Sequence, residues 1–237
     1  FAGSSYRYLD GVPALHQAGQ APRPVGLLLA LAGGILDSYS YLNRGQVFAT
    51  AETGNLVLLG INLSQGNWQQ VLHYLLPILA FAAGVLATEL LRRQMGPNAG
   101  HLHWRQPILL VECGVLVLVS FLPQGGLDPV ANMLISFTSA VQIESFRKFH
   151  GCACATTMCT GNLRSGTEHL FRHLTVPDSQ SAPKSMLYYG LILSFVTGAI
   201  LSGLFSPWMK GRTVLLACIP LLTAFSLMFR SQRMGKS

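Results

Sequence analysis

The chain has 237 residues, of which 50% are hydrophobic and only 11% are charged. This composition excludes an ordinary soluble domain, in which about a quarter of the residues are charged. The formal net charge of +7 raises the alternatives of nucleic-acid or anionic-lipid binding, which the positions of the basic residues decide below.

Six stretches of the chain are apolar over about the 17–25 residues that a bilayer crossing requires. A soluble protein could not bury so many helices that are apolar all round. We therefore predict an all-α membrane protein with six transmembrane helices in one domain, residues 25–230. Residues 1–24 lack a signal-peptide core and predict a cytoplasmic tail, as do residues 231–237. The apolar stretches are Val25–Leu42, Val71–Leu91, Pro107–Leu122, Pro129–Phe146, Met186–Phe205 and Thr213–Phe229.

The basic residues indicate how these helices are oriented. With six crossings and the N-terminus inside, all but three of the 16 lysines and arginines fall on the inner side, as the positive-inside rule expects. The three on the outer side are Arg44, Lys210 and Arg212. Eight crossings would divide the basic residues evenly between the two sides. The charge therefore indicates six crossings with both termini in the cytoplasm, and we expect no nucleic-acid partner.

A short motif occurs twice, in ATAETGNLVLLG from Ala49 and in ATTMCTGNLRSG from Ala155. The same offset aligns LDSY from Leu36 with IESF from Ile143, acid on acid and ring on ring. Because each half would hold three crossings, an odd number, the second copy must enter the membrane from the opposite face. We predict two inverted repeats, residues 25–122 and 129–229. Phe81-x-x-Gly84 and Phe195-x-x-Gly198 correspond as well, at a longer offset.

The two Thr-Gly-Asn segments are too apolar for ordinary loops and too polar for comfortable crossings. We predict re-entrant or broken-helix segments that dip in from opposite faces, with their tips meeting near the midplane. Each copy offers a threonine to cap a helix, a glycine to permit close approach and an asparagine to bind solute. The alternative is that each tripeptide caps an ordinary interfacial helix. The residues are Thr53, Gly54 and Asn55, and Thr160, Gly161 and Asn162.

Two acids lie inside predicted crossings, Asp37 near the outer end of the first and Glu144 near the inner end of the fourth. An acid at membrane depth is costly and is a functional candidate by default, so either could carry a proton or a cation. The alternatives are that Asp37 reaches the interface and that Glu144 pairs with Arg147 at helical spacing. Tyr41 and Gln142, on the same helices, complete the candidate site residues.

Nothing in the sequence indicates a metal, a cofactor or catalysis. Cys152, Cys154 and Cys159 lack the spacing of a zinc site, and no nucleophile–base pattern or phosphate-binding loop is present. We expect no metal, no cofactor and no enzyme activity. Glu89 and Glu112 are expected only to neutralise nearby arginines.

The blocks GGILDSYSYLNRGQVFATAETGNLVLLG and SAVQIESFRKFHGCACATTMCTGNL resemble the YoaK-like family of bacterial membrane proteins, a domain family of unknown function. The likeness runs from about Gly26 to Arg230. The family pattern has Gln-Asn where this chain has Gln142-Ile143. The resemblance implies a multi-pass protein of the bacterial inner membrane, in contact with the lipid bilayer, and supplies no substrate.

Two functions remain open. The first is a small-solute transporter or channel with its site between the Thr-Gly-Asn segments, where helix N-termini favour an anion or a neutral solute and the acids favour a cation. The second is an accessory subunit that packs against a membrane-protein partner, or against a second copy, and transports nothing. A polar cavity between the segments would favour the first function, and a dry, packed centre the second.

Overall fold

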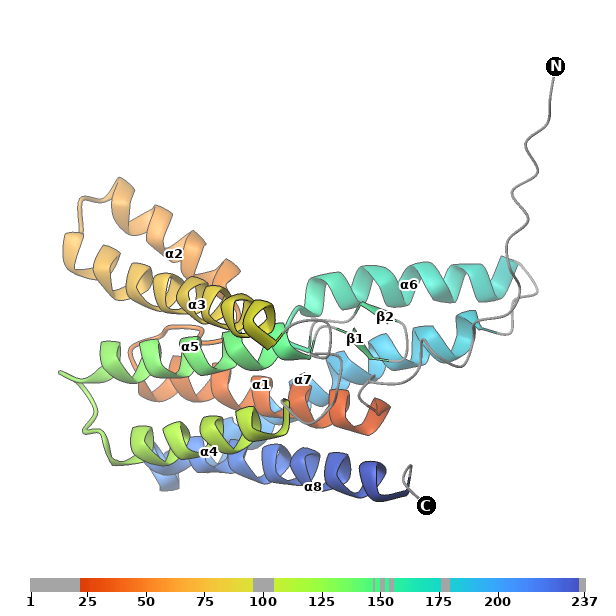
Figure 1. Ribbon diagram of the computed structural model, residues 1–237. Coiled ribbons are helices and arrows are strands. Elements are labelled where there is room, and N and C mark those ends of the chain that lie inside the picture. The colour runs from red at the N-terminus through yellow and green to blue at the C-terminus, as the bar shows by residue number, and fades with distance from the viewer. Residues whose placement is uncertain are drawn as a thin grey trace.

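The computed structural model describes residues 22–95, 105–146, 148–149, 152–153, 156–175 and 180–234. These residues are almost entirely helical (Figure 1). Within them, the only strands are β1 (Lys148–Phe149) and β2 (Cys152–Ala153), which form a minimal antiparallel pair. The prediction of an all-α protein is confirmed. The helices are α1 (Arg23–Asn43), α2 (Glu52–Ser64), α3 (Trp68–Met95), α4 (Gln106–Phe121), α5 (Asp128–Ser145), α6 (Cys159–Thr175), α7 (Ser181–Met209), the 3-10 helix η3 (Lys210–Ala217) and α8 (Cys218–Met234).

The predicted apolar stretches all fall on helices, in order on α1, α3, α4, α5, α7 and the pair η3 and α8. Among the described residues, three segments are long and apolar enough to cross a membrane: Arg23–Asn43, Trp68–Gln94 and Ser181–Phe229, the last covering α7, η3 and most of α8. α4 is a shorter apolar helix. α5 is less apolar because its buried face carries polar side chains, namely Asn132, Ser136, Thr138, Ser139 and Gln142.

The long helices alternate in direction. α1, α4 and α7 run one way across the molecule, and α3, α5 and α8 run the other way (Figure 1). As a result, α1 begins and α8 ends at the same end of the molecule. A proline in the first two positions of α1, α4 and α5 suits these starts, since the first helical residues need no N–H donor.

Helices from the two halves of the chain pack against one another. The most extensive contacts are those of α1 with α7 and of α3 with α5. Glycines allow these crossings: a Cβ atom on Gly198 would collide with the backbone of Leu31 in α1, and one on Gly84 would lie 2.5 Å from the Phe137 carbonyl oxygen in α5. Around this core, α2 packs on α3, α6 packs on α7, and α4 and α8 contact one another.

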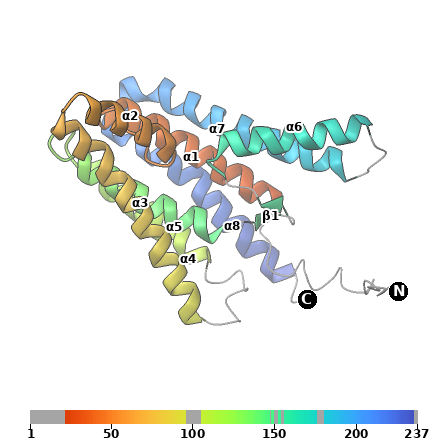
Figure 2. The ribbon, with the colours of Figure 1, turned by 90° about the horizontal axis from the view of Figure 1, so that it is seen from above.

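The two Thr-Gly-Asn segments form the helices α2 and α6. With 13 and 17 residues, they are about 20 and 25 Å long at 1.5 Å per residue, less than the ~30 Å of a bilayer core. Both begin near the middle of the molecule and run outward in opposite directions (Figure 1). Seen from above, α6 lies beside the first part of α7, away from α3 and α4 (Figure 2).

Arg44, which the charge count placed on the outer surface, is fully buried. It follows α1, and its guanidinium donates hydrogen bonds to the carbonyl oxygens of Val119, Leu122 and Pro123 and to the Asp128 carboxylate. The last carbonyls of a helix have no partner within it. Arg44 therefore satisfies the end of α4 and joins it to α1 and to the start of α5.

Candidate functional site

A cavity of about 390 Å³ lies where α2 and α6 begin. Its wall is mixed: threonine hydroxyls, one carboxyl and one thiol stand among phenylalanine and aliphatic side chains. Such a mixture is typical of small-molecule sites, in which a few polar groups orient a ligand against an apolar surface. The lining residues are Thr50, Ala51, Glu52, Thr53, Leu56, Phe81, Ile143, Thr157, Met158, Cys159, Thr160, Gly161 and Phe195.

The lining residues come largely from matching places in the two halves of the sequence. The cavity is lined by the four consecutive residues that precede the first Gly-Asn pair and by the four residues that precede the second Gly-Asn pair. The Phe81 and Phe195 rings, which belong to the second pair of matching motifs, lie on the same wall. The pairs are Thr50 and Thr157, Ala51 and Met158, Glu52 and Cys159, and Thr53 and Thr160.

The predicted roles of the two threonines need correction. Thr53 and Thr160 do line the cavity, but each is the second residue of its helix. The residue before α2 is Ala51, and no side chain caps that end. A hydroxyl two residues past the N-cap position cannot accept from the first free N–H groups, which point back along the helix axis. The backbone N–H groups at the start of α2 are therefore not closed off by a capping threonine.

The expectation that Asn55 binds solute is wrong. Its side chain is fully buried, and it is not among the lining residues of the cavity. Its Oδ1 accepts a hydrogen bond from the Phe48 N–H at 2.9 Å, while Nδ2 donates to the Phe48 carbonyl at 2.6 Å and to Glu52 Oε2 at 2.8 Å. Asn55 therefore holds the loop before α2 and orients Glu52. Asn162 is also buried and also does not line the cavity.

Gly54 permits a close approach, as predicted, but its neighbour is the chain's own loop. A Cβ atom there would lie 2.5 Å from Phe48 Cδ2. The Phe48 ring in turn stacks on Tyr41, with ring centroids 5.0 Å apart, so Tyr41 supports the loop from outside the cavity. Gly161 differs: a Cβ atom there would meet nothing within 4 Å, and the residue lines the cavity.

Asp37 lies just behind the cavity wall and is buried. Its Oδ1 accepts a hydrogen bond from the Thr50 N–H at 2.7 Å, which links α1 to the lining loop. The alternative that Asp37 reaches the interface is therefore wrong. Glu52, which does line the cavity, is close enough to Asp37 for the two carboxyl groups to repel one another.

Glu144 and Gln142 are committed to other partners. Glu144 forms an ion pair with Arg92 of α3 at 3.1 Å, and Arg147, its expected partner, lies outside the described residues. Gln142 donates to Glu112 Oε2 at 2.8 Å. Neither residue lines the cavity.

Glu112 was expected to neutralise an arginine at a helix end, and this is wrong. It is buried in the middle of α4, and its carboxylate accepts a hydrogen bond from the neutral amide of Gln142. Glu89, in contrast, pairs with Arg92 at 2.6 Å as expected.

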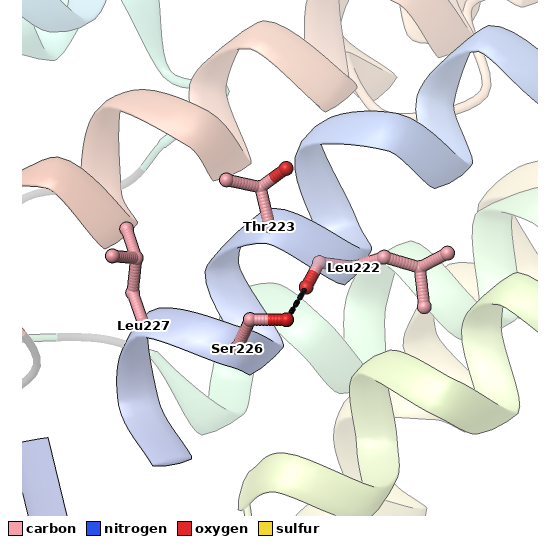
Figure 3. A pocket seen from close by; sticks show the side chains of 4 residues that line it. All are labelled: Leu222, Thr223, Ser226 and Leu227. Carbon is pink, nitrogen blue, oxygen red and sulfur yellow. Dashed lines mark hydrogen bonds between the residues drawn. The ribbon is translucent and has the colours of Figure 1, made fainter. Parts of the chain in front are cut away.

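Another hollow in the described part of the molecule fits a binding site less well. It has a volume of about 360 Å³, lies on the flank of α8 and is lined by Leu222, Thr223, Ser226 and Leu227 (Figure 3). Its two hydroxyls donate to carbonyls of their own helix, Ser226 to Leu222 and Thr223 to Ile219. Those hydroxyl protons are not available to a ligand, and the surface is part of a single helix.

Sequence reasoning did not select Thr50, Glu52 or Thr157 as site residues. A usable signal was present, because the two copies of the motif align without a gap for several residues before Thr-Gly-Asn. The residues just before the tripeptide, rather than the tripeptide itself, form most of the wall. Glu52 has no base at helical spacing, and Asp37 has only Arg44, two turns further on, which was a second signal.

The long apolar helices define an integral membrane protein. The chain belongs to the family described as "Protein of unknown function (DUF1275)", whose model matches residues 25–227. It is 27% identical over 188 residues to the UPF0700 transmembrane protein YoaK of Bacillus subtilis (strain 168), covering 76% of this chain and 82% of that protein. The resemblance inferred from the motifs is thus confirmed. No solved structure matches the chain.

Proposed function

We propose that the protein is a small-solute transporter or channel of the inner membrane, with its solute site in the cavity between α2 and α6. The observation that carries this proposal is the composition of the cavity wall. Residues at matching positions of the two halves, Thr50 with Thr157 and Phe81 with Phe195 among them, line one space. Transporters built from inverted repeats hold their substrate at the interface between the repeats, beside broken helices.

The packing of the helices supports the inverted repeat. If α1 to α4 correspond to α5 to α8, exchanging the halves turns the contact of α1 with α7 into that of α5 with α3, and both are made. The contacts of α2 with α3 and of α4 with α5 likewise become those of α6 with α7 and of α8 with α1. Corresponding helices run in opposite directions (Figure 1), which agrees with six crossings and a two-fold axis in the membrane plane.

Labelling of cysteines tests whether water and solute reach the cavity. Cys159 lines it, so one variant keeps only Cys159, with the other four cysteines replaced by alanine or serine. A second variant lacks all native cysteines and carries Thr53→Cys, a lining position on α2 rather than α6. A small, charged methanethiosulfonate reagent that does not cross lipid should modify both positions in membrane vesicles.

The matched control is a variant that keeps only Cys113, which is buried in α4 and does not line the cavity. It should remain unmodified. If the protein is a transporter, the reagent should reach both cavity positions from each face of the membrane in turn. If it is a channel, the reagent should reach them from both faces at once. Protection of both positions from either face would contradict a solute pathway and favour the accessory subunit.

A further inference from the structure

We propose that Asp37, Thr50, Glu52 and Ser136 form a binding site for one Na⁺ ion beside the solute cavity. The two carboxyl groups are used in the same way. Asp37 Oδ1 accepts from the Thr50 N–H and Glu52 Oε2 accepts from Asn55, so one oxygen of each group is anchored. The second oxygen of each, Asp37 Oδ2 and Glu52 Oε1, is buried and has no hydrogen-bond partner among the described residues.

A hydroxyl side chain lies beside each carboxyl group. The Thr50 side chain is beside Asp37, and the Ser136 side chain, from α5, is beside Glu52. Thr50 is 4% exposed and Ser136 is fully buried, yet neither hydroxyl has a hydrogen-bond partner in the described part of the chain. Buried polar groups are nearly always satisfied. Each hydroxyl is placed to donate to the carboxyl group beside it while keeping its own oxygen lone pairs free, so the buried group of two carboxyls and two hydroxyls indicates a ligand that accepts electron pairs from oxygen.

A hard cation is such a ligand, because Na⁺, Mg²⁺ and Ca²⁺ bind carboxylate, hydroxyl and water oxygens. A transition metal is less suitable, since no group of three or more His, Cys, Asp or Glu side chains comes together in the described ranges. Glu52 also lines the cavity, so water from the cavity can complete the coordination of an ion held by the two protein carboxyls and hydroxyls.

The charge of the surroundings favours a monovalent ion. Two carboxylates contribute a charge of −2, and each helix N-terminus contributes roughly +0.5. α2 begins at Glu52, and α6 begins at Cys159, which is close enough to Asp37 for an electrostatic interaction. The remaining charge is about −1, which one Na⁺ neutralises. Helix N-termini alone favour an anion and the two acids alone favour a cation. With both present, the net negative charge favours one monovalent cation.

The corresponding place in the second half lacks this arrangement. Glu144 stands where the first half has Asp37, and Arg92 already neutralises it. Cys159 stands where the first half has Glu52. The chain therefore holds one site of this kind rather than two, and Glu144 is a matched control for Asp37. A role of this Na⁺ ion in driving solute movement would rest on the proposed function. The binding of Na⁺ does not depend on that function.

The test is thermal unfolding of the purified full chain in detergent, in choline chloride and in NaCl at equal ionic strength. Na⁺ should raise the Tm by roughly 5–10 °C when its concentration reaches a hundred times its Kd. Asp37→Asn and Glu52→Gln, which keep the anchored acceptor oxygen and remove the charge, should abolish the shift. Ser136→Ala should weaken Na⁺ binding about tenfold, and Glu144→Gln should leave the shift intact even if its starting Tm falls.

Equilibrium binding of radioactive ²²Na⁺ to the wild-type protein, at one ion per chain, gives a second readout that does not depend on any variant folding. A wild-type Tm that responds to NaCl no more than to choline chloride would overturn the proposal. So would a shift that survives Asp37→Asn or Glu52→Gln, a shift given only by Mg²⁺ or Ca²⁺, or a response to pH alone. If Na⁺ binds while the cavity cysteines stay protected, the cation site stands and the transport function fails.

Discussion

The carboxylate of Asp37 accepts a hydrogen bond from the backbone N–H of Thr50 at 2.7 Å. This bond joins the last third of α1 to the loop that leads into α2, and it holds Thr50 and Glu52 at the cavity wall. The position of one side of the candidate site therefore depends on an acid in a neighbouring helix that does not line the cavity.

Replacing Asp37 should separate its structural role from its charge. Asp37→Ala removes the acceptor and leaves the buried Thr50 N–H unsatisfied, so it should lower the free energy of unfolding by about 1–3 kcal/mol. Asp37→Asn keeps a carbonyl oxygen at the same place and should retain most of that stability. Chemical unfolding in detergent micelles measures both. Equal losses in the two variants would show that the charge, and not the hydrogen bond, stabilises the wall.

Arg44 should be among the most sensitive positions of the chain. It is fully buried, and Arg44→Ala would strand the Asp128 carboxylate and the carbonyl oxygens at the end of α4. Breaking a buried ion pair by removing one partner costs about 3–5 kcal/mol. The control is Arg172→Ala, which breaks an exposed pair with Glu168 that contributes only about 0.3–0.5 kcal/mol. Similar losses in the two variants would argue against the buried cluster.

The crossing of α1 and α7 can be tested with two glycines of one helix. A Cβ atom on Gly198 would collide with the Leu31 carbonyl oxygen, whereas one on Gly203 would meet nothing within 4 Å. Gly198→Ala should therefore destabilise the protein by about 1–3 kcal/mol through overpacking. Gly203→Ala should be neutral, or stabilising by up to about 1 kcal/mol through its helix propensity. A stable Gly198→Ala protein would show that the helices do not cross there.

Both termini should lie on the cytoplasmic side. α1 begins and α8 ends at one end of the molecule, and α5 begins at the opposite end, where the loop before Asp128 leads into it (Figure 1). A reporter that is active only in the cytoplasm should give a signal when fused after Ser237 and none when inserted in the loop before Asp128. The six-span arrangement places an odd number of crossings between the two sites. A signal at both places would mean an even number and would contradict it.

The helices and their approximate bounds could be predicted because apolar length is a property of each stretch by itself. The apolar stretch beginning at Val71, for example, falls on a helix that extends only a few residues further at each end. The place of the candidate site could also be predicted, since the duplicated motif marks it. Both follow from local pattern or from internal comparison, neither of which requires knowledge of tertiary contacts.

The roles of single side chains could not be predicted in the same way. Nothing near Asn55 in the sequence indicates that the Phe48 backbone uses up its amide. Glu112 seemed to be a helix-end acid because arginines precede it, but its partner is Gln142, thirty positions away on another helix. Arg44 follows an apolar stretch and has the pattern of an interfacial charge. For Glu112 and Arg44 the deciding partner comes from a distant part of the chain, and for Asn55 it comes from a nearby loop whose path depends on tertiary contacts.

The burial of Arg44 has a consequence for how the protein is made. One partner, the Tyr39 hydroxyl, belongs to α1 itself, but the carbonyl and carboxylate partners lie 75 to 84 residues later in the chain. At a synthesis rate of about 5–20 residues per second, roughly 4–17 seconds pass between the two. During that time the Tyr39 hydroxyl is the one buried acceptor that the arginine has among these partners, so we expect the end of α1 to stay in the watery headgroup region while the ribosome completes α2, α3 and α4. The end of α1 therefore reaches its final packing only after α4 and the start of α5 have been made, so a later segment captures an earlier one.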